Sequence, residues 1–190
     1  FDRLNKMADI QDKGDQMLLF HIIITKMGTT ESWIRLLKHV IVGIFKFNLG
    51  STLFIHSDLD MTSILNPEFL HHYSERIFVV PIYCADMIVS NAKNGLSDVG
   101  LYLARFGKGR PYYYSHFTDY YRMLLLFSFG GVYMDTDILL RQSVAHVRNS
   151  AVREDDVFVN GAILSFNRYS PVLKYGLLQI PKVYDAFTWN

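Results

Sequence analysis

A short apolar run, a helix pattern and a second apolar run follow one another near the N-terminus. Residues 17–25 (MLLFHIIIT) are mostly apolar at both alternating positions, which is typical of a strand buried on both faces. Residues 30–50 carry apolar side chains at helical spacing and end in a glycine, and residues 52–56 (TLFIH) resemble a second strand. Strand, helix and strand in this order form the βαβ unit of a parallel sheet covered by helices. The chain is therefore expected to adopt an α/β fold.

Four further elements follow from the same patterns. Residues 76–82 (RIFVVPI) predict a third strand, whose proline places it near an edge or a strand end. Residues 120–129 (YYRMLLLFSF) predict a helix that the pair Gly130-Gly131 ends with a sharp turn. The strand predicted over residues 132–140 (VYMDTDILL) follows directly, and residues 157–166 (VFVNGAILSF) form another apolar run.

The composition is that of a packed domain. Hydrophobic residues make up 50% of the 190 residues and aromatic ones 15%, which suffices for one substantial core. We expect a polar lead-in without firm structure over residues 1–16, and one domain, incomplete at its C-terminus, over residues 17–190. Lys and Arg (19) balance Asp and Glu (18) and are dispersed along the chain, so nucleic acid is not an expected partner.

Cysteine content and hydropathy restrict the chain further. The single cysteine, Cys84, excludes an internal disulfide framework and a zinc site built from clustered cysteines. No run approaches the roughly 18 to 20 uninterrupted apolar residues that a membrane-spanning helix needs. The sequence starts at Phe1 and stops at Asn190 without a polar tail. We therefore expect a piece of a longer protein, with room for an N-terminal membrane anchor outside it.

Two carboxylates stand two residues apart in the run FSFGGVYMDTDILL. In an extended segment, side chains two apart point the same way, so Asp135 and Asp137 are expected to share one side with Tyr133. Like charges this close are costly, and a proton, a cationic side chain or a bound metal relieves the cost. Open α/β sheets bind ligands at the carboxyl ends of their strands. A hard oxygen site for Mg²⁺ or Mn²⁺ is therefore favoured over a solvated strand end.

Charged residues in the preceding segments are further candidates. Asp119 and Arg122 lie three apart on one face of the predicted helix, where a local ion pair is the simpler interpretation. His116 is the only histidine of the seven near this helix start. Lys108 and Arg110, in the loop FGKGRP, could approach a phosphate, although solvated loop charges are the simpler interpretation.

The segment HFTDYYRMLLLFSFGGVYMDTD resembles the DXD-containing glycosyltransferases, a family that includes α-1,4-galactosyl- and N-acetylglucosaminyltransferases, yeast α-1,6-mannosyltransferases and, more distantly, clostridial glucosylating toxins. The family pattern is roughly [ST]-D-x-x-R, an apolar helix and G-G-[VI]-Y-x-D-x-D. The matching residues are Thr118, Asp119, Arg122, Gly130, Gly131, Val132, Tyr133, Asp135 and Asp137. A weaker match at residues 158–166 (FVNGAILSF) implicates Asn160.

This resemblance implies a fold and a set of roles. The fold is the GT-A type, an α/β nucleotide-sugar-binding fold whose central, mostly parallel sheet is flanked by helices. Asp137 would bind Mn²⁺ or Mg²⁺ directly, and Asp135 would contact the metal or the ribose and sugar of the donor. Asp119 and Arg122 would grip hydroxyls of the donor sugar, and Asn160 would line the sugar or acceptor side. Tyr133 is expected to pack rather than to take part in chemistry.

The implied activity is metal-dependent transfer of a hexose, with retention, from a nucleotide sugar to a glycan, glycolipid or protein acceptor. A UDP-sugar is favoured over a GDP-sugar. The implied location is the Golgi or secretory-pathway lumen, as a type II membrane protein, in a eukaryote and the cytoplasm otherwise. Two alternatives stay open. One is a domain that binds nucleotide sugar or carbohydrate without catalysis. The other is a haloacid-dehalogenase-like phosphatase with Asp135 as nucleophile, although Ile138-Leu139 depart from that motif.

Overall fold

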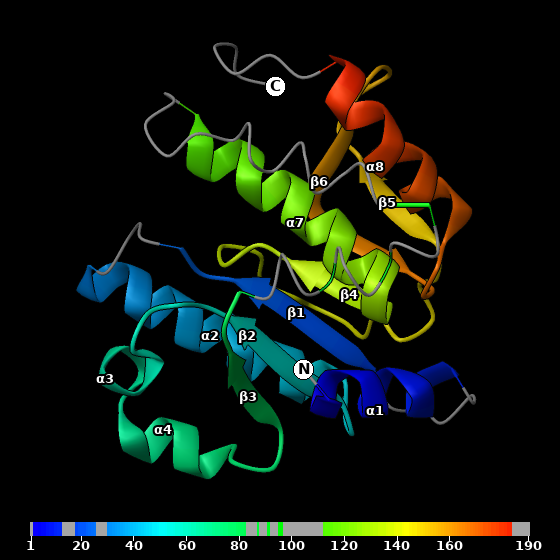
Figure 1. Cartoon of the computed structure of the whole chain (residues 1–190). Coiled ribbons are helices and arrows are strands. Elements are labelled where there is room, and N and C mark those ends of the chain that lie inside the picture. The colour runs from blue at the N-terminus through cyan, green and yellow to red at the C-terminus, as the bar shows by residue number, and fades with distance from the viewer. Residues whose placement is uncertain are drawn as a thin grey trace.

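The computed structural model describes residues 2–12, 18–25, 30–82, 87, 91, 95–96 and 112–183, and within this part the strands form one six-stranded sheet (Figure 1). The strand order is β3-β2-β1-β4-β6-β5. The strands are β1 (Leu19–Ile23), β2 (Thr52–His56), β3 (Ile77–Val80), β4 (Gly131–Met134), β5 (Ser150–Arg153) and β6 (Val159–Phe166). The first four strands of the order pair in parallel, and β6 runs antiparallel to both of its neighbours. The expected α/β fold with a mostly parallel sheet is confirmed, and β3 lies at an edge as its proline predicted.

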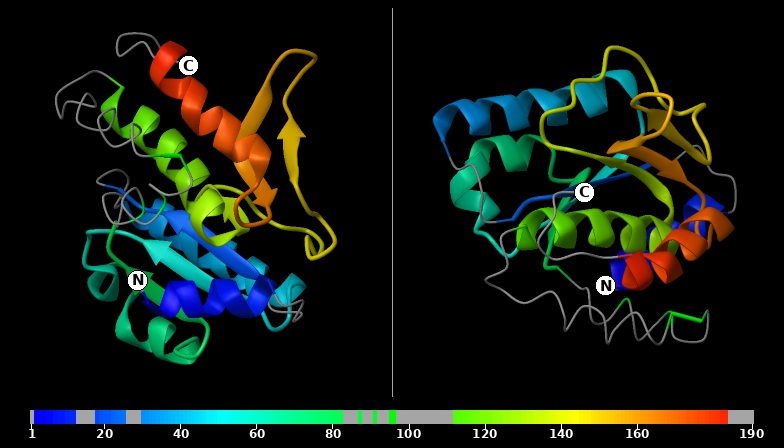
Figure 2. Two further views of the ribbon diagram at one scale, coloured as in Figure 1. Left: turned by 45° about the vertical axis from the view of Figure 1, so that its right-hand side comes forward. Right: turned by 90° about the horizontal axis from the view of Figure 1, so that it is seen from above.

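Helices cover both faces of this sheet. They are α1 (Asp2–Asp12), α2 (Glu31–Phe47), α3 (Met61–Leu65), α4 (Pro67–His72), α7 (Tyr113–Phe129) and α8 (Pro171–Val183). Figure 2, right, shows α2 on one side of the sheet and α7 on the other. In β1, Phe20 and Ile22 pack with α2, whereas Leu19 and Ile23 pack with α7. The strand is therefore buried on both faces, as its apolar run predicted.

The junction between α7 and β4 depends on two glycines. The amide of Gly130 donates to the carbonyl of Leu126 at 2.8 Å and closes the helix. Gly130 and Gly131 have φ angles of 68° and 100°, a region that residues with a Cβ rarely adopt. A Cβ on Gly131 would lie 2.5 Å from the carbonyl oxygen of Leu19 in β1. The pair therefore ends the helix and lets β4 run directly beside β1.

The expectation of an unstructured lead-in over residues 1–16 is wrong for most of that segment. Helix α1 spans Asp2–Asp12 and packs on the α7 side of the core, where Leu4 and Ala8 are buried. Their spacing of four residues, with Met7 beside them, is the helical signal that the polar composition concealed. An ion pair with Arg168 stabilises the position of the helix, since the guanidinium of Arg168 lies 2.6 Å from the carboxylate of Asp9.

The strand predicted over residues 132–140 is also shorter than expected. Strand β4 ends at Met134, and the last contact with β6 is the bond from the amide of Asp135 to the carbonyl of Ala162, at 2.8 Å. The amide of Ile138 then donates to the carbonyl of Asp135 at 3.3 Å, which makes a turn. Asp135 and Asp137 therefore do not sit on a strand, and the argument from alternating sides does not apply to Asp137.

Besides α1, the elements that the sequence patterns missed are α3 (Met61–Leu65), α4 (Pro67–His72), β5 (Ser150–Arg153) and α8 (Pro171–Val183). In the part of the chain that the structure describes, no helix has the length and apolar character needed to cross a bilayer. Cys84, Lys108 and Arg110, which the sequence analysis considered, lie outside the described residues.

Candidate functional site

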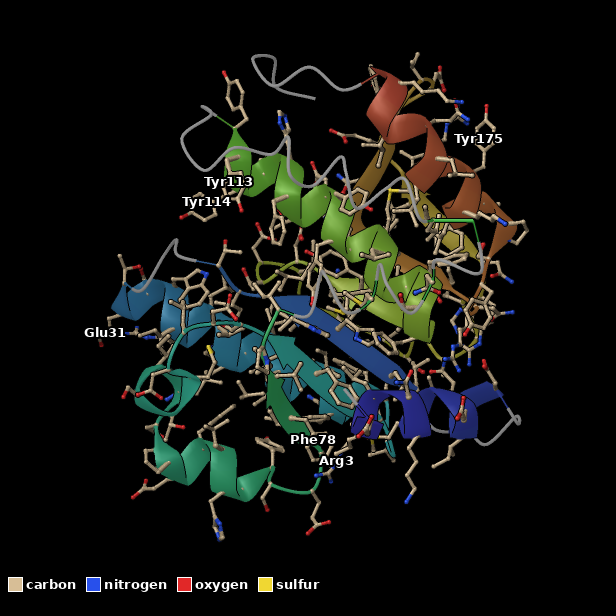
Figure 3. All side chains as sticks on the ribbon, in the orientation of Figure 1. Arg3, Glu31, Phe78, Tyr113, Tyr114 and Tyr175 are labelled. Atoms are coloured by element: carbon tan, nitrogen blue, oxygen red, sulfur yellow. The ribbon has the colours of Figure 1, made fainter. Side chains whose placement is uncertain are left out.

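A cleft of about 1050 Å³ lies between the N-terminal half of α7, the β5–β6 hairpin and α8. Figure 2, left, shows the hairpin rising beside α8. One part of the lining is polar and includes Asp119, Arg122, Asp135 and Asn160. The rest is largely apolar, and it includes Tyr175 of α8, which Figure 3 labels. Four of the five site residues predicted from the sequence therefore line one cleft, and Asp137 is not among its lining residues.

Arg122 is the centre of the polar part. Its side chain is only 10% exposed, and its guanidinium lies 2.7 Å from a carboxylate oxygen of Asp119 and 3.5 Å from one of Asp135. The same group donates to the carbonyl of Gly161 on β6 at 2.7 Å and to the carbonyl of Thr118 at 3.3 Å. The ion pair predicted from the i, i+3 spacing is present. The contacts to Asp135 and Gly161 were not predicted, because they join segments far apart in the sequence.

Tyr133 takes part in this cluster as well. It is buried in β4, and its hydroxyl donates to Oδ1 of Asp135 at 2.5 Å. The guanidinium carbon of Arg122 lies over its ring, 4.7 Å from the centroid, which is a cation–π contact. The expectation that Tyr133 only packs is therefore incomplete, since it also holds a carboxylate. The signal in the sequence was the spacing of two residues between Tyr133 and Asp135.

The carboxyl groups of Asp119 and Asp135 are partly buried, and this burial changes their pKa values. Burial raises the pKa of Asp119 above its usual range, against the attraction of Arg122, and Asp135 raises it further. Burial likewise raises the pKa of Asp135, although Arg122 and the Tyr133 hydroxyl oppose this and Asp137 adds to it. Carboxylates that repel each other in a partly buried cleft favour a further cation.

The possible metal ligands of this site can be compared with the ligands that a divalent cation needs. Within the described residues, no group of three His, Cys, Asp or Glu side chains gathers to form a complete metal cage. Asp135 and the exposed Asp137 lie at the turn after β4 and offer hard oxygen ligands. A Mg²⁺-like ion is commonly held by one or two carboxylates and completes its coordination with water and substrate phosphates. The two aspartates supply ligands of the type that such an ion takes, from a single turn.

Asn160 lines the same cleft on β6, next to Gly161, whose carbonyl accepts from Arg122. Its side-chain oxygen accepts from the amide of Ala162 at 2.7 Å, and its amide nitrogen lies 3.3 Å from Glu154. The side chain is thus oriented by its own strand. His116 is buried in α7, and its electrostatic interaction with Asp119 lowers the pKa of that carboxyl.

Residues 25–158 match the family model described as a glycosyltransferase sugar-binding region containing a DXD motif. The chain belongs to this family. The match includes the segment from Asp119 to Asp137 and ends just before Asn160. The resemblance found in the sequence is thereby confirmed.

Curated relatives match parts of this glycosyltransferase family domain. An uncharacterized protein of Arabidopsis thaliana is 35% identical over 77 residues, which are 39% of this chain and 12% of that protein. Lactosylceramide 4-alpha-galactosyltransferase of Homo sapiens is 27% identical over 89 residues, which are 47% of this chain and 25% of that enzyme. The matched region is therefore only a small part of each relative.

Solved structures share the fold at low sequence identity. The PaToxG glycosyltransferase has a TM-score of 0.57 at 12% identity, over 95% of this chain and 66% of that chain. The bacterial N-acetylglucosamine transferase NleB has a TM-score of 0.51 at 16% identity, over 91% of this chain and 84% of that chain. These likenesses confirm the GT-A-type fold expected from the sequence.

Proposed function

We propose that this chain carries the donor site of a metal-dependent glycosyltransferase that transfers a hexose from a nucleotide sugar. The observation that supports the proposal best is the arrangement of Arg122 between Asp119 and Asp135 at the polar end of the cleft. A buried guanidinium flanked by two carboxylates offers both donors and acceptors to the hydroxyls of a sugar. The match to the glycosyltransferase family model independently favours glycosyl transfer as the reaction.

Each residue then has a role in binding. Asp137, with Asp135, would hold Mn²⁺ or Mg²⁺, and the bound ion would supply Lewis-acid stabilisation of the departing diphosphate. Asp119 and Arg122 would orient the donor sugar, and Arg122 is also suited to steady negative charge that develops on phosphate. Tyr133 keeps Asp135 in one orientation through its hydroxyl. Asn160 would contact the sugar or the acceptor from β6.

The donor nucleotide, the stereochemical outcome, the acceptor class and the location are proposed from the family resemblance. We propose a UDP-sugar donor, with a GDP-sugar less favoured, and transfer with retention. The acceptor would be a glycan, a glycolipid or a protein, and the galactosyltransferase relative, named for lactosylceramide, supports the glycolipid class. In a eukaryote, the proposed location is the Golgi or secretory-pathway lumen, reached through a membrane anchor outside this chain.

The test is a screen of nucleotide-sugar donors with the full-length protein, read by mass detection of the hydrolysed or transferred sugar. Activity should require Mn²⁺ or Mg²⁺, and Asp137→Asn should abolish it while leaving the unfolding midpoint unchanged. Asp156→Asn is the matched control, because Asp156 is an exposed aspartate in the β5–β6 turn that does not line the cleft. It should keep full activity.

Other results would favour the alternatives. Activity that survives a chelator, or that Asp137→Asn retains, would contradict the metal assignment. Binding of UDP with Mn²⁺, measured by calorimetry, without turnover of any donor would indicate a non-catalytic binding domain. Release of phosphate from a phosphomonoester, with Asp135 covalently phosphorylated, would instead identify a phosphatase.

A further inference from the structure

Two histidines lie side by side in the core beneath α7. His21 of β1 and His56 of β2 are both fully buried, and Nδ1 of His21 lies 3.1 Å from Nε2 of His56. The other ring nitrogen of His21 lies 3.0 Å from the carbonyl oxygen of Gly130, and the hydroxyl of Tyr121 lies 3.4 Å from Nδ1 of His56. One chain of hydrogen bonds therefore joins two strands, the middle of α7 and the turn that leads into β4.

The donor and acceptor of every hydrogen bond in this series follow from the carbonyl of Gly130. The carbonyl of Gly130 can only accept, so Nε2 of His21 must carry the proton. In the neutral ring, Nδ1 of His21 is then bare and accepts from Nε2–H of His56. Nδ1 of His56 is bare in turn and accepts from the Tyr121 hydroxyl. Both histidines are thus neutral Nε2–H tautomers, and a single pattern of protons satisfies all four ring nitrogens.

This chain of bonds lies next to the carboxylate cluster. His21 is in register with Tyr133 on the neighbouring strand, and Tyr121 immediately precedes Arg122 on α7. The bonds anchor α7 at Tyr121 and at its C-terminal turn. Because Arg122 projects from the same helix and reaches Asp135 at the end of β4, its distance to that carboxylate depends on where α7 lies on the sheet.

We propose that His21, His56 and Tyr121 are positioning residues that form an uncharged relay, which docks α7 on the sheet and thereby holds Arg122 beside Asp135. Burial keeps the relay neutral, since it lowers the pKa of His21 to about 4 and that of His56 well below its usual value. The titratable side chains that face the two imidazoles in the described residues are Tyr121 and Tyr133, and no carboxylate is among their described contacts. The inference concerns the free protein and does not rest on the proposed function.

The first test uses the unmodified protein. Two-dimensional ¹⁵N NMR of the histidine side chains at pH 7 should show two rings as neutral Nε2–H tautomers that do not titrate between pH 7 and 5. The neighbours Phe54 and Phe129 provide contacts that assign the His21 signals. An Nδ1–H tautomer, or titration of either ring near pH 6.5, would overturn the relay.

The second test separates positioning from general stability. His21→Phe and Tyr121→Phe break the two ends of the relay and keep an aromatic ring at each position. Both should shift and broaden the side-chain N–H signals of Arg122 in ¹⁵N NMR, because the guanidinium moves away from Asp135 and from the carbonyl of Gly161. The controls are Ile22→Val and Ile55→Val, since these residues sit on the same strands but pack on the α2 side. They should lower stability without moving the Arg122 signals. Unchanged Arg122 signals in both relay variants, with a stability loss like that of the controls, would show that the relay is only structural.

Discussion

The bond between Tyr133 and Asp135 allows a sharp test of how the cluster is organised. Tyr133→Phe deletes one buried hydroxyl and keeps the ring on which Arg122 stacks. A hydrogen bond to a charged group contributes about 1.5–3 kcal/mol. The Asp135 side chain is 33% exposed, so water can replace part of the lost bond and the lower end applies. About 1.5 kcal/mol corresponds to a loss of roughly tenfold in kcat/KM, at the low end of the effect of losing an outer-shell partner of a metal ligand.

The pH dependence of the same variant adds a second readout. The Tyr133 hydroxyl lowers the pKa of Asp135, against the rise that burial causes. Without the hydroxyl, this pKa should rise, so that the carboxyl takes up a proton at higher pH. The acid limb of the activity profile should therefore move to higher pH in Tyr133→Phe.

The assay is metal-dependent donor hydrolysis by the full-length protein, measured from pH 5 to 8 at saturating and limiting donor. Tyr73→Phe is the matched control, because Tyr73 packs on Phe45 and Phe69 on the α2 side of the sheet, outside the cleft. It should leave both the rate and the acid limb unchanged. Wild-type kcat/KM together with an unmoved acid limb in Tyr133→Phe would refute the role of the hydroxyl in orienting Asp135.

Two further predictions concern folding. Gly131→Ala should destabilise the protein by several kcal/mol in urea unfolding, because a Cβ would meet the Leu19 carbonyl at 2.5 Å in a backbone region unsuited to alanine. The control is Gly43→Ala in α2, which should stabilise the protein by up to about 1 kcal/mol, because the added Cβ has space there. Equal effects of the two substitutions would contradict the close packing of β4 on β1. For pH, the folded pKa of His21, about 4, lies below its unfolded value of 6.5, so the folded state is favoured fully above pH 6.5 and loses stability as the pH falls toward 4. The loss of unfolding free energy from this residue is about 3 kcal/mol. Asp119 and Asp135 act in the opposite direction, because their pKa values are raised in the folded state. A His21→Phe variant whose unfolding free energy depends on pH as in the wild type would contradict this account.

Several structural features were predictable because the signal is local. The apolar run of β1 identified a strand buried on both faces, and the helical spacing of residues 30–50 identified α2. Gly130 and Gly131 identified the end of α7, since a left-handed turn is a property of the residues themselves. The order and spacing of the nine matching residues between Thr118 and Asp137 sufficed to recognise the family.

The site itself depended on contacts that a sequence pattern does not encode. Strand β4 ends at Met134 because the chain turns after Asp135 has paired with Ala162 of β6, so the predicted strand through Asp137 was too long. Helix α1 is held by buried Leu4 and by Arg168, which is far away along the chain.

What the sequence determined by itself was therefore the strand–helix–strand framework, the glycine turn and the acidic motif, because each is specified by residues within a few positions of one another. Only the tertiary structure decided that Arg122 reaches Asp135 and Gly161, and that His21 reaches His56 and Gly130. These pairs come from different elements, and their distances are set by how α7 packs on the sheet. The physical reason is that local periodicity fixes which face a side chain occupies, whereas packing between distant segments fixes which partner it meets there.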